Sequence, residues 1–322
     1  TEQARTELLS SWKPNASREL LESRAALLNR VRIFFSEQGV LEVETPLLAS
    51  SSITDPNIEI FETESDKKKY LQTSPEYAMK RLLCADSGPI FQIAKAFRGK
   101  EIGRYHNPEF SILEWYRPNY DYHKLMSEVF ELIKVCLGRL KYKKISYRDI
   151  FCDLLGIDPF IATQDELLAV ARKYLDVIKL DLKRSDILDL LMGNILQPKL
   201  SSEGVCFIFD YPEDQAALAR LRNENGIVVA ERFELFIDGV ELANGYTELA
   251  NESQQRMRFI SENKLRIEVG KEPRAIDEKF MSALKSGLPF CSGVAVGLDR
   301  LLMLQGGWLS IEETLAFSWD NC

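Results

Sequence analysis

The first regular pattern of apolar positions lies between residues 17 and 37, where apolar side chains recur at helical spacing. It predicts a long amphipathic helix that ends ahead of Gly39, a good C-terminal stop. Residues 40–46 then alternate in the manner of a strand, and Pro46 prevents pairing beyond it. A helix followed by an edge strand is therefore expected at the start of the chain.

Strand and helix patterns alternate in the next part of the chain. They predict a strand over 70–73, a helix over 75–84 and strands over 89–97 and 110–116, with a polar, irregular stretch at 98–109. The last two strands form a hairpin with a long loop, the kind of place in which functional residues commonly lie.

The pattern changes between residues 145 and 204, where we expect a small helical insertion. Thr163 and Glu166 form a capping box for a helix that reaches Tyr174, and Ser185 begins a second helix that reaches Met192. Further elements follow from the same patterns, as strands at 205–211, 228–237, 240–246 and 292–298 and helices at 252–269, 277–286 and from Asp299. Runs of strands with the helices set apart from them indicate an α+β domain around an antiparallel sheet.

Composition narrows the class of protein. The net charge of −8 argues against a broad surface for a phosphate backbone, which requires a basic face. The six cysteines and the two histidines, His106 and His123, lack metal-ligand spacing. The 322 residues are 45% hydrophobic, and no apolar run reaches the roughly 18 residues that span a bilayer, so we expect a cytoplasmic globular enzyme.

Two acidic residues are expected to converge at a hairpin. Asp238-Gly239 is a strong signal for a two-residue loop, which pairs Glu234 with Ala243 and places Glu241 diagonally opposite Glu234 on one face. A divalent cation relieves the repulsion between the carboxylates, and oxygen ligands suit magnesium. A solvated acidic sheet face is the alternative.

Glu248 lies seven residues beyond Glu241, so strict alternation places it on the opposite face. A bulge at Asn244-Gly245 would reset the register and bring Glu248 to the same pocket. We therefore predict an irregularity at those two residues.

Arginines and small residues at strand ends suit a nucleotide site. Arg98 begins the polar loop, where a guanidinium clamps a phosphate, although an exposed arginine is the alternative. Phe110 stacks a purine or packs in the core. Small residues alternate along 293–297 ahead of Arg300, and they allow either a flat ligand or close helix packing.

Glu76, Glu114 and Tyr116 are polar residues within apolar patterns. Buried carboxylates require partners, and two or three such groups suit a substrate with two amines. Ser74-Pro75-Glu76 is also consistent with an ordinary helix N-terminus.

Three segments in order make the chain resemble the class II aminoacyl-tRNA synthetases of the lysyl subgroup. Residues 39–46 are similar to motif 1 of that family, 97–116 to motif 2 and 293–300 to motif 3. Together these segments span nearly the whole chain. Within the family the resemblance is strongest toward lysyl-synthetase paralogues that attach β-lysine to elongation factor P, at residues 73–77, 103–110 and 113–118.

The resemblance implies an antiparallel sheet flanked by helices, a homodimer built on motif 1, and the use of ATP and Mg²⁺. The implied reaction activates (R)-β-lysine or lysine as an acyl-adenylate and transfers it to the ε-amino group of a lysine of elongation factor P. Two alternatives stay open: a truncated synthetase that charges tRNA or forms free lysyl-adenylate, and a non-catalytic regulator. Intact Arg98, Glu234, Glu241 and Arg300 argue against the regulator.

The resemblance also implies roles for residues. Arg98 is expected on the α-phosphate and, with Arg300, to be catalytic, while Phe110 and Arg300 sandwich adenine. The implied metal ligands are Glu234 and Glu241. The implied ATP-binding set is Arg98, Gly99, Lys100, Asn107, Phe110, Glu241, Leu242, Gly297 and Arg300. The implied substrate-binding set is Ser74, Pro75, Glu76, Glu114, Tyr116, Asn244, Tyr246, Glu248 and Ala295.

Three features refine the resemblance. Only residues 1–38 precede motif 1, so we expect one catalytic domain over 1–322, no N-terminal anticodon-binding barrel (OB fold) and no tRNA partner. Ala295 stands where lysyl ligases typically have glycine, and one methyl group in a packed pocket is worth about 1 to 3 kcal/mol of discrimination. Lys100 stands where the family usually has a glutamate that accepts from adenine, so Glu101 or a backbone carbonyl substitutes, or adenine selectivity is looser.

Overall fold

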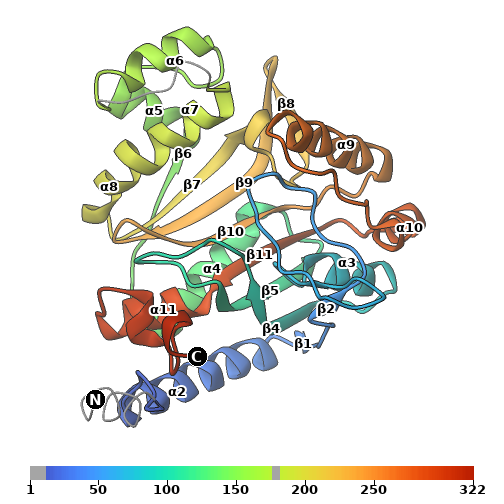
Figure 1. Ribbon diagram of the computed structural model, residues 1–322. Coiled ribbons are helices and arrows are strands. Elements are labelled where there is room, and N and C mark those ends of the chain that lie inside the picture. Colours follow the sequence, from blue (N-terminus) through green and yellow to red (C-terminus); the bar gives the residue numbers. More distant parts are fainter. Residues whose placement is uncertain (1–11, 176–181) are drawn as a thin grey trace, which may run out of the picture.

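The centre of the molecule is one large sheet with helices packed around it, as the computed structural model in Figure 1 shows for residues 12–175 and 182–322. In those ranges the sheet has nine strands in the order β1-β4-β5-β11-β10-β9-β7-β6, with β8 paired to β9. They span Leu41–Glu42 (β1), Ile90–Phe97 (β4), Glu109–Pro118 (β5), Lys143–Ser146 (β6), Val205–Pro212 (β7), Leu221–Glu224 (β8), Ile227–Ile237 (β9), Val240–Thr247 (β10) and Cys291–Gly297 (β11). The predicted α+β class is confirmed. The sheet is mixed rather than antiparallel, because β1 runs parallel to β4 and β6 runs parallel to β7.

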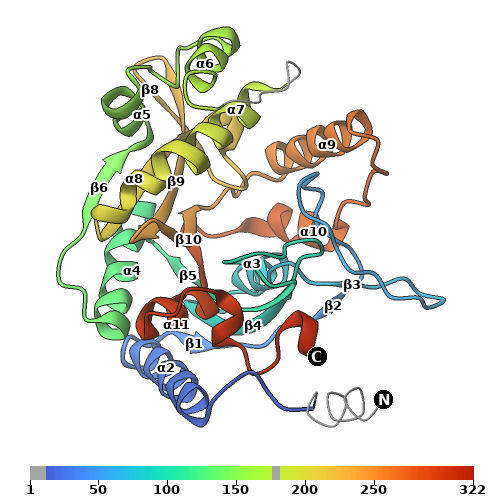
Figure 2. The same cartoon turned by 60° about the vertical axis from the view of Figure 1, so that its left-hand side comes forward.

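The helices form groups around this sheet. They span Arg18–Glu37 (α2), Glu76–Cys84 (α3), Tyr122–Leu137 (α4), Tyr147–Leu155 (α5), Gln164–Ala171 (α6), Arg184–Leu191 (α7), Gln197–Lys199 (α8), Glu252–Glu268 (α9), Glu278–Gly287 (α10) and Leu298–Gly306 (α11). Figures 1 and 2 show α5 to α8 gathered beside β6 and β7, away from α3 and α10, and an ion pair between Lys183 and Glu268 joins the start of α7 to the end of α9. No helix within the described ranges combines the length and the apolar composition that a bilayer crossing requires.

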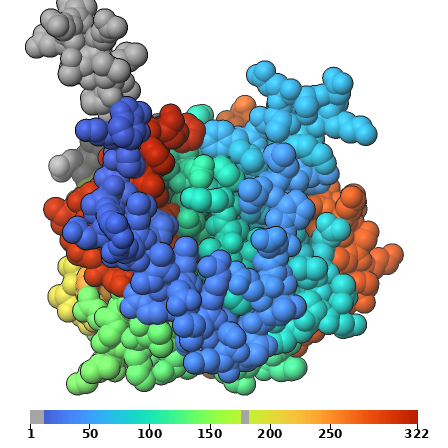
Figure 3. All heavy atoms as spheres, turned by 90° about the horizontal axis from the view of Figure 1, so that it is seen from below, coloured from blue at the N-terminus to red at the C-terminus, as the bar shows by residue number. Residues whose placement is uncertain are grey.

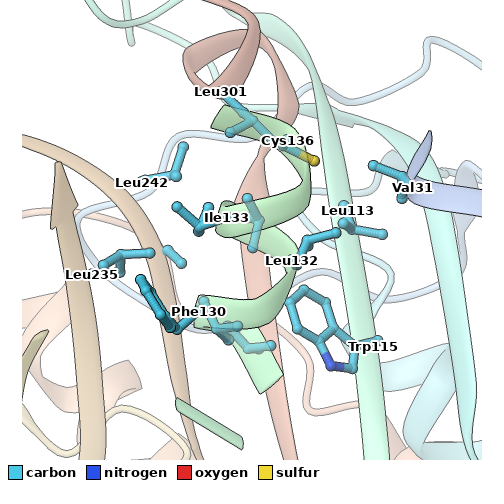
Figure 4. Close-up of a cluster of buried hydrophobic side chains, with 14 of the residues drawn as sticks. Val31, Leu113, Trp115, Phe130, Leu132, Ile133, Cys136, Leu235, Leu242 and Leu301 are labelled. Carbon is cyan, nitrogen blue, oxygen red and sulfur yellow. The ribbon is translucent and has the colours of Figure 1, made fainter. Parts of the chain in front are cut away.

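Helix α4 packs one face into the centre of the core and exposes the other, and the sequence patterns did not predict it. Asp121 caps its first turn by accepting a hydrogen bond from Lys124 N, and Gly138 ends it in a left-handed conformation. Figure 4 shows the apolar face of α4 between Leu113 and Trp115 of β5 and side chains from neighbouring strands and helices. This packing fixes β5 and β10, the two strands that carry most of the polar residues of interest.

The predicted N-terminal helix is confirmed as α2, whose N-cap Ser17 accepts a hydrogen bond from Leu20 N. The strand expected over 40–46 is shorter than predicted. Only Leu41 and Glu42 are paired with β4 as a strand, although Val43 N still donates to the Phe91 carbonyl at 2.9 Å. Seen from below, the segment that includes α2 and the residues after it lies across one face of the molecule (Figure 3).

The strand predicted over 70–73 is also short. Tyr70–Leu71 (β3) pairs with Leu48–Ala49 (β2) in a separate two-stranded sheet, so it is not part of the main sheet. The helix predicted over 75–84 and the strands predicted over 89–97 and 110–116 are confirmed as α3, β4 and β5.

The insertion predicted at 145–204 is helical in the described residues. The capping box of Thr163 and Glu166 is present at the start of α6, and α7 begins one residue before Ser185. Two helices that the patterns did not predict, α5 and α8, join them. Side chains such as Phe151, Leu167 and Leu188 pack together and against the sheet, so the insertion has a hydrophobic cluster of its own.

The hairpin between β9 and β10 has the predicted two-residue loop, with Asp238 and Gly239 both at positive φ. Its register differs from the prediction. Glu234 lies opposite Asn244 rather than Ala243, because one extra residue, Leu242, bulges out between Glu241 and Ala243.

The irregularity predicted at Asn244-Gly245 is wrong, since pairing continues through both residues to Tyr246 on each side of β10. The bulge at Leu242 instead produces the effect predicted for a bulge at Asn244-Gly245. An extra residue between Glu241 and Glu248 reverses the alternation, so both side chains line the same cavity.

Candidate active site

A cavity of about 320 Å³ lies over β5, β10 and β11 and brings together residues from distant parts of the sequence. Most of the side chains singled out from the sequence line it, namely Ser74, Glu76, Arg98, Asn107, Phe110, Glu114, Tyr116, Glu241, Leu242, Asn244, Tyr246, Glu248, Ala295, Gly297 and Arg300. Four others, Pro75, Gly99, Lys100 and Glu234, lie outside its lining.

One end of the cavity is rich in arginine and aromatic side chains. The Arg98 guanidinium lies 5.2 Å from the ring centre of Phe110, and its Nε donates to the Thr73 carbonyl at 3.4 Å. Both side chains are half-buried, so a planar ligand can contact the ring and an anionic ligand can contact the cation.

Arg300 joins the polar loop to the bulged hairpin. Its Nε donates to the Tyr105 carbonyl at 3.0 Å and its Nη1 to the Glu241 carbonyl at 2.7 Å. The preceding residue, Asp299, is buried and accepts from Ser111 N at 2.7 Å and from Arg24 at 2.5 Å. Asp299 was not singled out in the sequence, and its contacts fix the start of α11, where Arg300 lies.

His106 lies beside Arg300, with its Nε2 2.8 Å from Arg300 Nη2. Burial, helped by the nearby Arg300 charge, lowers the pKa of His106 from its usual value. The neutral ring therefore accepts from the guanidinium. No role was predicted for His106 beyond its place in residues 103–110, because a single histidine in a loop does not by itself indicate a function.

Some residues of motif 2 line the cavity and others point away from it. Asn107 lines the cavity, but its amide is engaged by Glu109 and Trp319 of the chain itself. Lys100 has positive φ and a largely exposed side chain that points toward Glu59, at 3.9 Å. Glu101, not Lys100, lines the cavity. The position of Glu101 in the cavity wall is therefore compatible with the alternative in which Glu101 replaces the family's glutamate as the acceptor from adenine.

The two carboxylates expected to bind a metal differ in exposure. Glu241 is open to the cavity, whereas Glu234 is mostly buried and accepts from Arg232 at 2.5 Å and from Tyr211 at 2.7 Å. Burial, helped by the neighbouring Glu241 charge and opposed by Arg232, raises the pKa of Glu234 to about 7. The two side chains are thus close enough to interact electrostatically.

Residues 12–175 and 182–322 contain no cluster of three or more His, Cys, Asp or Glu side chains arranged for a metal. Magnesium commonly takes only one or two carboxylates, together with substrate phosphates and water. The exposed carboxylate of Glu241, with Glu234 behind it, fits that mode of binding.

The other end of the cavity is acidic and buried. Glu114 accepts from Ser74 Oγ at 2.7 Å and from Tyr116 OH at 2.6 Å. Burial, with the added repulsion of Glu76, raises the pKa of Glu114 to about 7. Such a carboxylate gains a proton easily and exchanges it for a cationic ligand.

Glu76 begins α3, with Pro75 as its N-cap residue, and accepts from Tyr246 OH at 2.6 Å and from Lys80 Nζ at 2.5 Å. Lys80 is almost completely buried and also forms an ion pair with Glu248. Nothing in the sequence distinguishes Lys80 as a site residue, because a lysine on an amphipathic helix is normally solvated.

Small residues on β11 make room for these acidic side chains. A Cβ at Gly293 would lie 2.3 Å from the Tyr116 ring and 2.5 Å from Glu248 Oε1. Ala295 pairs with Glu114 on one side and with Asn244 on the other, and its methyl group faces the cavity. The alternating small residues on β11 therefore leave space for the cavity and for the acidic side chains that line it.

The fold and this cavity define a class of protein. A family model for the class II tRNA synthetases (D, K and N) matches residues 2–321, and the chain belongs to that family. The curated relatives are more specific. They include proteins named "Elongation factor P--(R)-beta-lysine ligase" from Proteus mirabilis, 44% identical over 319 residues, and from Photobacterium profundum, 43% identical over 318 residues. Each alignment covers 96% of this chain and 98% of the relative.

Proposed function

We propose that the protein uses ATP to activate a diamino acid, (R)-β-lysine or lysine, and transfers it to a lysine of elongation factor P. The curated relatives carry the name of that activity over nearly the whole length of the chain. The observation that carries the proposal is the arrangement of charges in the cavity, which has arginines at one end and, at the other, the buried carboxylates of Glu114 and Glu248 with the partly buried Glu76.

The acidic end suits a substrate with two ammonium groups. Glu76, Glu114 and Glu248 all line the cavity, and Lys80, which is not part of the lining, forms ion pairs with Glu76 and Glu248. Unpaired charges at such depth are costly, so the pocket favours a ligand that supplies positive charge at two points. Glu76 with Ser74 would hold one amine, and Glu114, Tyr116 and Glu248 the other.

The first half-reaction joins the substrate carboxylate to the α-phosphorus of ATP. The carboxylate is already ionised at neutral pH and needs no base. Arg98 would stabilise the charge that develops on the α-phosphate as pyrophosphate leaves, while Phe110 and Arg300 would hold the adenine between them. A bound Mg²⁺ would neutralise phosphate charge; Glu241 would hold it directly, and Glu234 would join it by exchanging its hydrogen bonds from Arg232 and Tyr211.

In the second half-reaction a lysine amine of the acceptor protein attacks the acyl-adenylate carbonyl and AMP leaves. The product is an amide, and the attacking amine loses a proton. Because the acceptor is a translation factor, we infer that the protein acts in the cytoplasm.

We also propose a homodimer built on motif 1 and a single catalytic domain that includes the helical insertion. Leu41 of β1, within motif 1, is 58% exposed, and Leu48 of β2, two residues beyond motif 1, is 47% exposed. Apolar side chains grouped on short edge strands are suited to an interface.

ATP–pyrophosphate exchange tests the first half-reaction. We expect exchange that depends on an added amino acid, with (R)-β-lysine preferred over (S)-β-lysine and lysine. Incubation with labelled amino acid and tRNA, elongation factor P or neither then identifies the acceptor. Label found only in tRNA would refute the proposal, and the absence of exchange with every amino acid would favour a non-catalytic protein.

A further inference from the structure

Lys80 is a cation that the proposed reaction does not use, yet it lies at the acidic end of the cavity. Its side chain is 1% exposed, on the first turns of α3. Nζ lies 2.5 Å from Glu76 Oε1 and also forms an ion pair with Glu248, from a part of the chain far away in sequence. One lysine therefore joins two carboxylates that both line the cavity.

Aromatic rings complete the surroundings of the Lys80 amine. Nζ lies 5.4 Å from the ring centre of Tyr246 and 6.0 Å from that of Phe280. The hydroxyl of Tyr246 in turn donates to Glu76. Rings at these distances attract a cation and exclude water, so the lysine is held at a fixed point rather than solvated.

The charges around Lys80 do not balance. Glu76 and Glu248 contact it and Glu114 lies nearby, so three carboxylates face one resident cation. The other titratable groups around it are Tyr246, Cys84 and Cys291. When all three carboxylates are ionised, the deficit corresponds to two positive charges, the number of ammonium groups in a diamino acid.

Glu248 has capacity left for a ligand. It is 4% exposed, and neither of its oxygens accepts a hydrogen bond of ordinary geometry within the described residues, despite the contact with Lys80. Burial and the charge of Glu76 raise the pKa of Glu248 to about 8, although Lys80 opposes the rise. A carboxylate in this condition gains from an additional ammonium donor.

We propose that Lys80 is a positioning and specificity-determining residue, a resident cation that keeps Glu76 and Glu248 together and sets the cavity to accept a ligand with two ammonium groups. The inference rests on the proposed function, since it names the chemistry of the same pocket. Without Lys80, two neighbouring carboxylates lose their shared counter-ion, so one of them retains a proton and no longer receives an ammonium group.

The test replaces Lys80 by two neutral residues, Lys80→Met and Lys80→Gln, and retains the cation in Lys80→Arg. In ATP–pyrophosphate exchange with (R)-β-lysine, we expect the amino-acid KM of both neutral variants to rise about tenfold or more, with the KM for ATP unchanged. Recovery in Lys80→Arg is the expected sign that the charge is responsible. Lys134→Met, at an exposed ion pair on α4, is the matched control and is expected to behave as the unaltered protein.

The pH profile separates positioning from simple structural support. Removal of the cation raises the pKa of the carboxylate pair, so the amino-acid KM of Lys80→Gln should continue to fall at pH values where that of the unaltered protein has levelled. An unchanged profile with equal losses for ATP and amino acid would overturn the proposal.

Calorimetric binding of cadaverine, a diamine without a carboxylate, gives a readout that does not depend on catalysis. We expect the unaltered protein to bind it and the neutral variants to bind it at least tenfold more weakly. If exchange fails but this difference holds, the proposed function falls and the role of Lys80 stands. If exchange proceeds and cadaverine binds equally to all variants, the role of Lys80 falls.

Discussion

Arg98 is the single side chain on which the first half-reaction depends most, because it combines a half-buried guanidinium with a position beside the Phe110 ring. We predict that Arg98→Ala lowers kcat/KM in pyrophosphate exchange about 10²- to 10³-fold, the loss that follows removal of one group aimed at developing charge. Lys95→Ala, at an exposed ion pair on β4, the strand that ends directly before Arg98, is the control. Equal activity of both variants would contradict the role of Arg98.

Glu114 and Glu248 make a prediction about pH and stability. Burial raises their pKa values to about 7 and about 8, above the value of about 4.3 for an unfolded glutamate. At pH values between the unfolded pKa and the folded pKa values, the folded state binds more protons than the unfolded state. The free energy of unfolding therefore falls as pH rises through this interval.

We therefore expect the Tm of the ligand-free protein to fall between about pH 4.5 and pH 8 and to level above that range. A diammonium amino acid binds the ionised carboxylates, so the gain in Tm on its addition should grow over the same interval. Glu248→Gln should weaken both trends, as differential scanning fluorimetry can measure. A gain in Tm that shrinks as pH rises would contradict this account.

At the scale of secondary structure, the acidic end of the cavity depends on a close approach between β11 and the side chains of its neighbours. Gly293→Ala would place a methyl group within 2.3 Å of the Tyr116 ring and 2.5 Å of Glu248 Oε1. We predict a rise in the amino-acid KM of about tenfold or more, with the KM for ATP less affected.

Gly193→Ala is the matched control, because a Cβ at Gly193 meets nothing within 4 Å and the residue lies in the helical insertion. Steady-state exchange kinetics of the two variants suffice as the measurement. A loss shared equally between ATP and amino acid in Gly293→Ala would indicate general disruption of the sheet and would refute the local explanation.

The elements with clear periodicity were predictable from the sequence, and those set by distant partners were not. The β9–β10 loop follows from Asp238-Gly239 alone, since few residues other than Asn, Asp and Gly suit its two positive φ angles. The bulge at Leu242 depends on how the side chains of β10 pack against both neighbours, which the local pattern does not specify. Register beyond the loop was therefore wrong by one residue.

The same distinction holds for the candidate site. Arg98, Glu114 and Arg300 were found because polar residues interrupt apolar patterns or belong to motifs. Lys80 was not, because its burial arises from Glu248, a residue that only the folded sheet brings beside it. Likewise β1 ended early, since the number of residues that pair at an edge depends on its neighbour β4.

At the scale of the whole molecule, the proposed dimer depends on the exposed apolar side chains near motif 1. Leu41→Asp introduces a charge at a residue of β1 that is 58% exposed, so we expect a fall from dimer to monomer in size-exclusion chromatography with light scattering. Leu140→Asp, at a residue that is 76% exposed elsewhere, should leave the dimer intact. A dimer of undiminished stability in Leu41→Asp would show that the interface lies elsewhere.

The most direct test of the account is the intact mass of elongation factor P after incubation with the protein, ATP and (R)-β-lysine. We predict an increase by one β-lysyl group on a single lysine, dependent on ATP and absent with Arg98→Ala. Unmodified elongation factor P in the presence of active pyrophosphate exchange, or transfer of the amino acid to tRNA instead, would contradict the account.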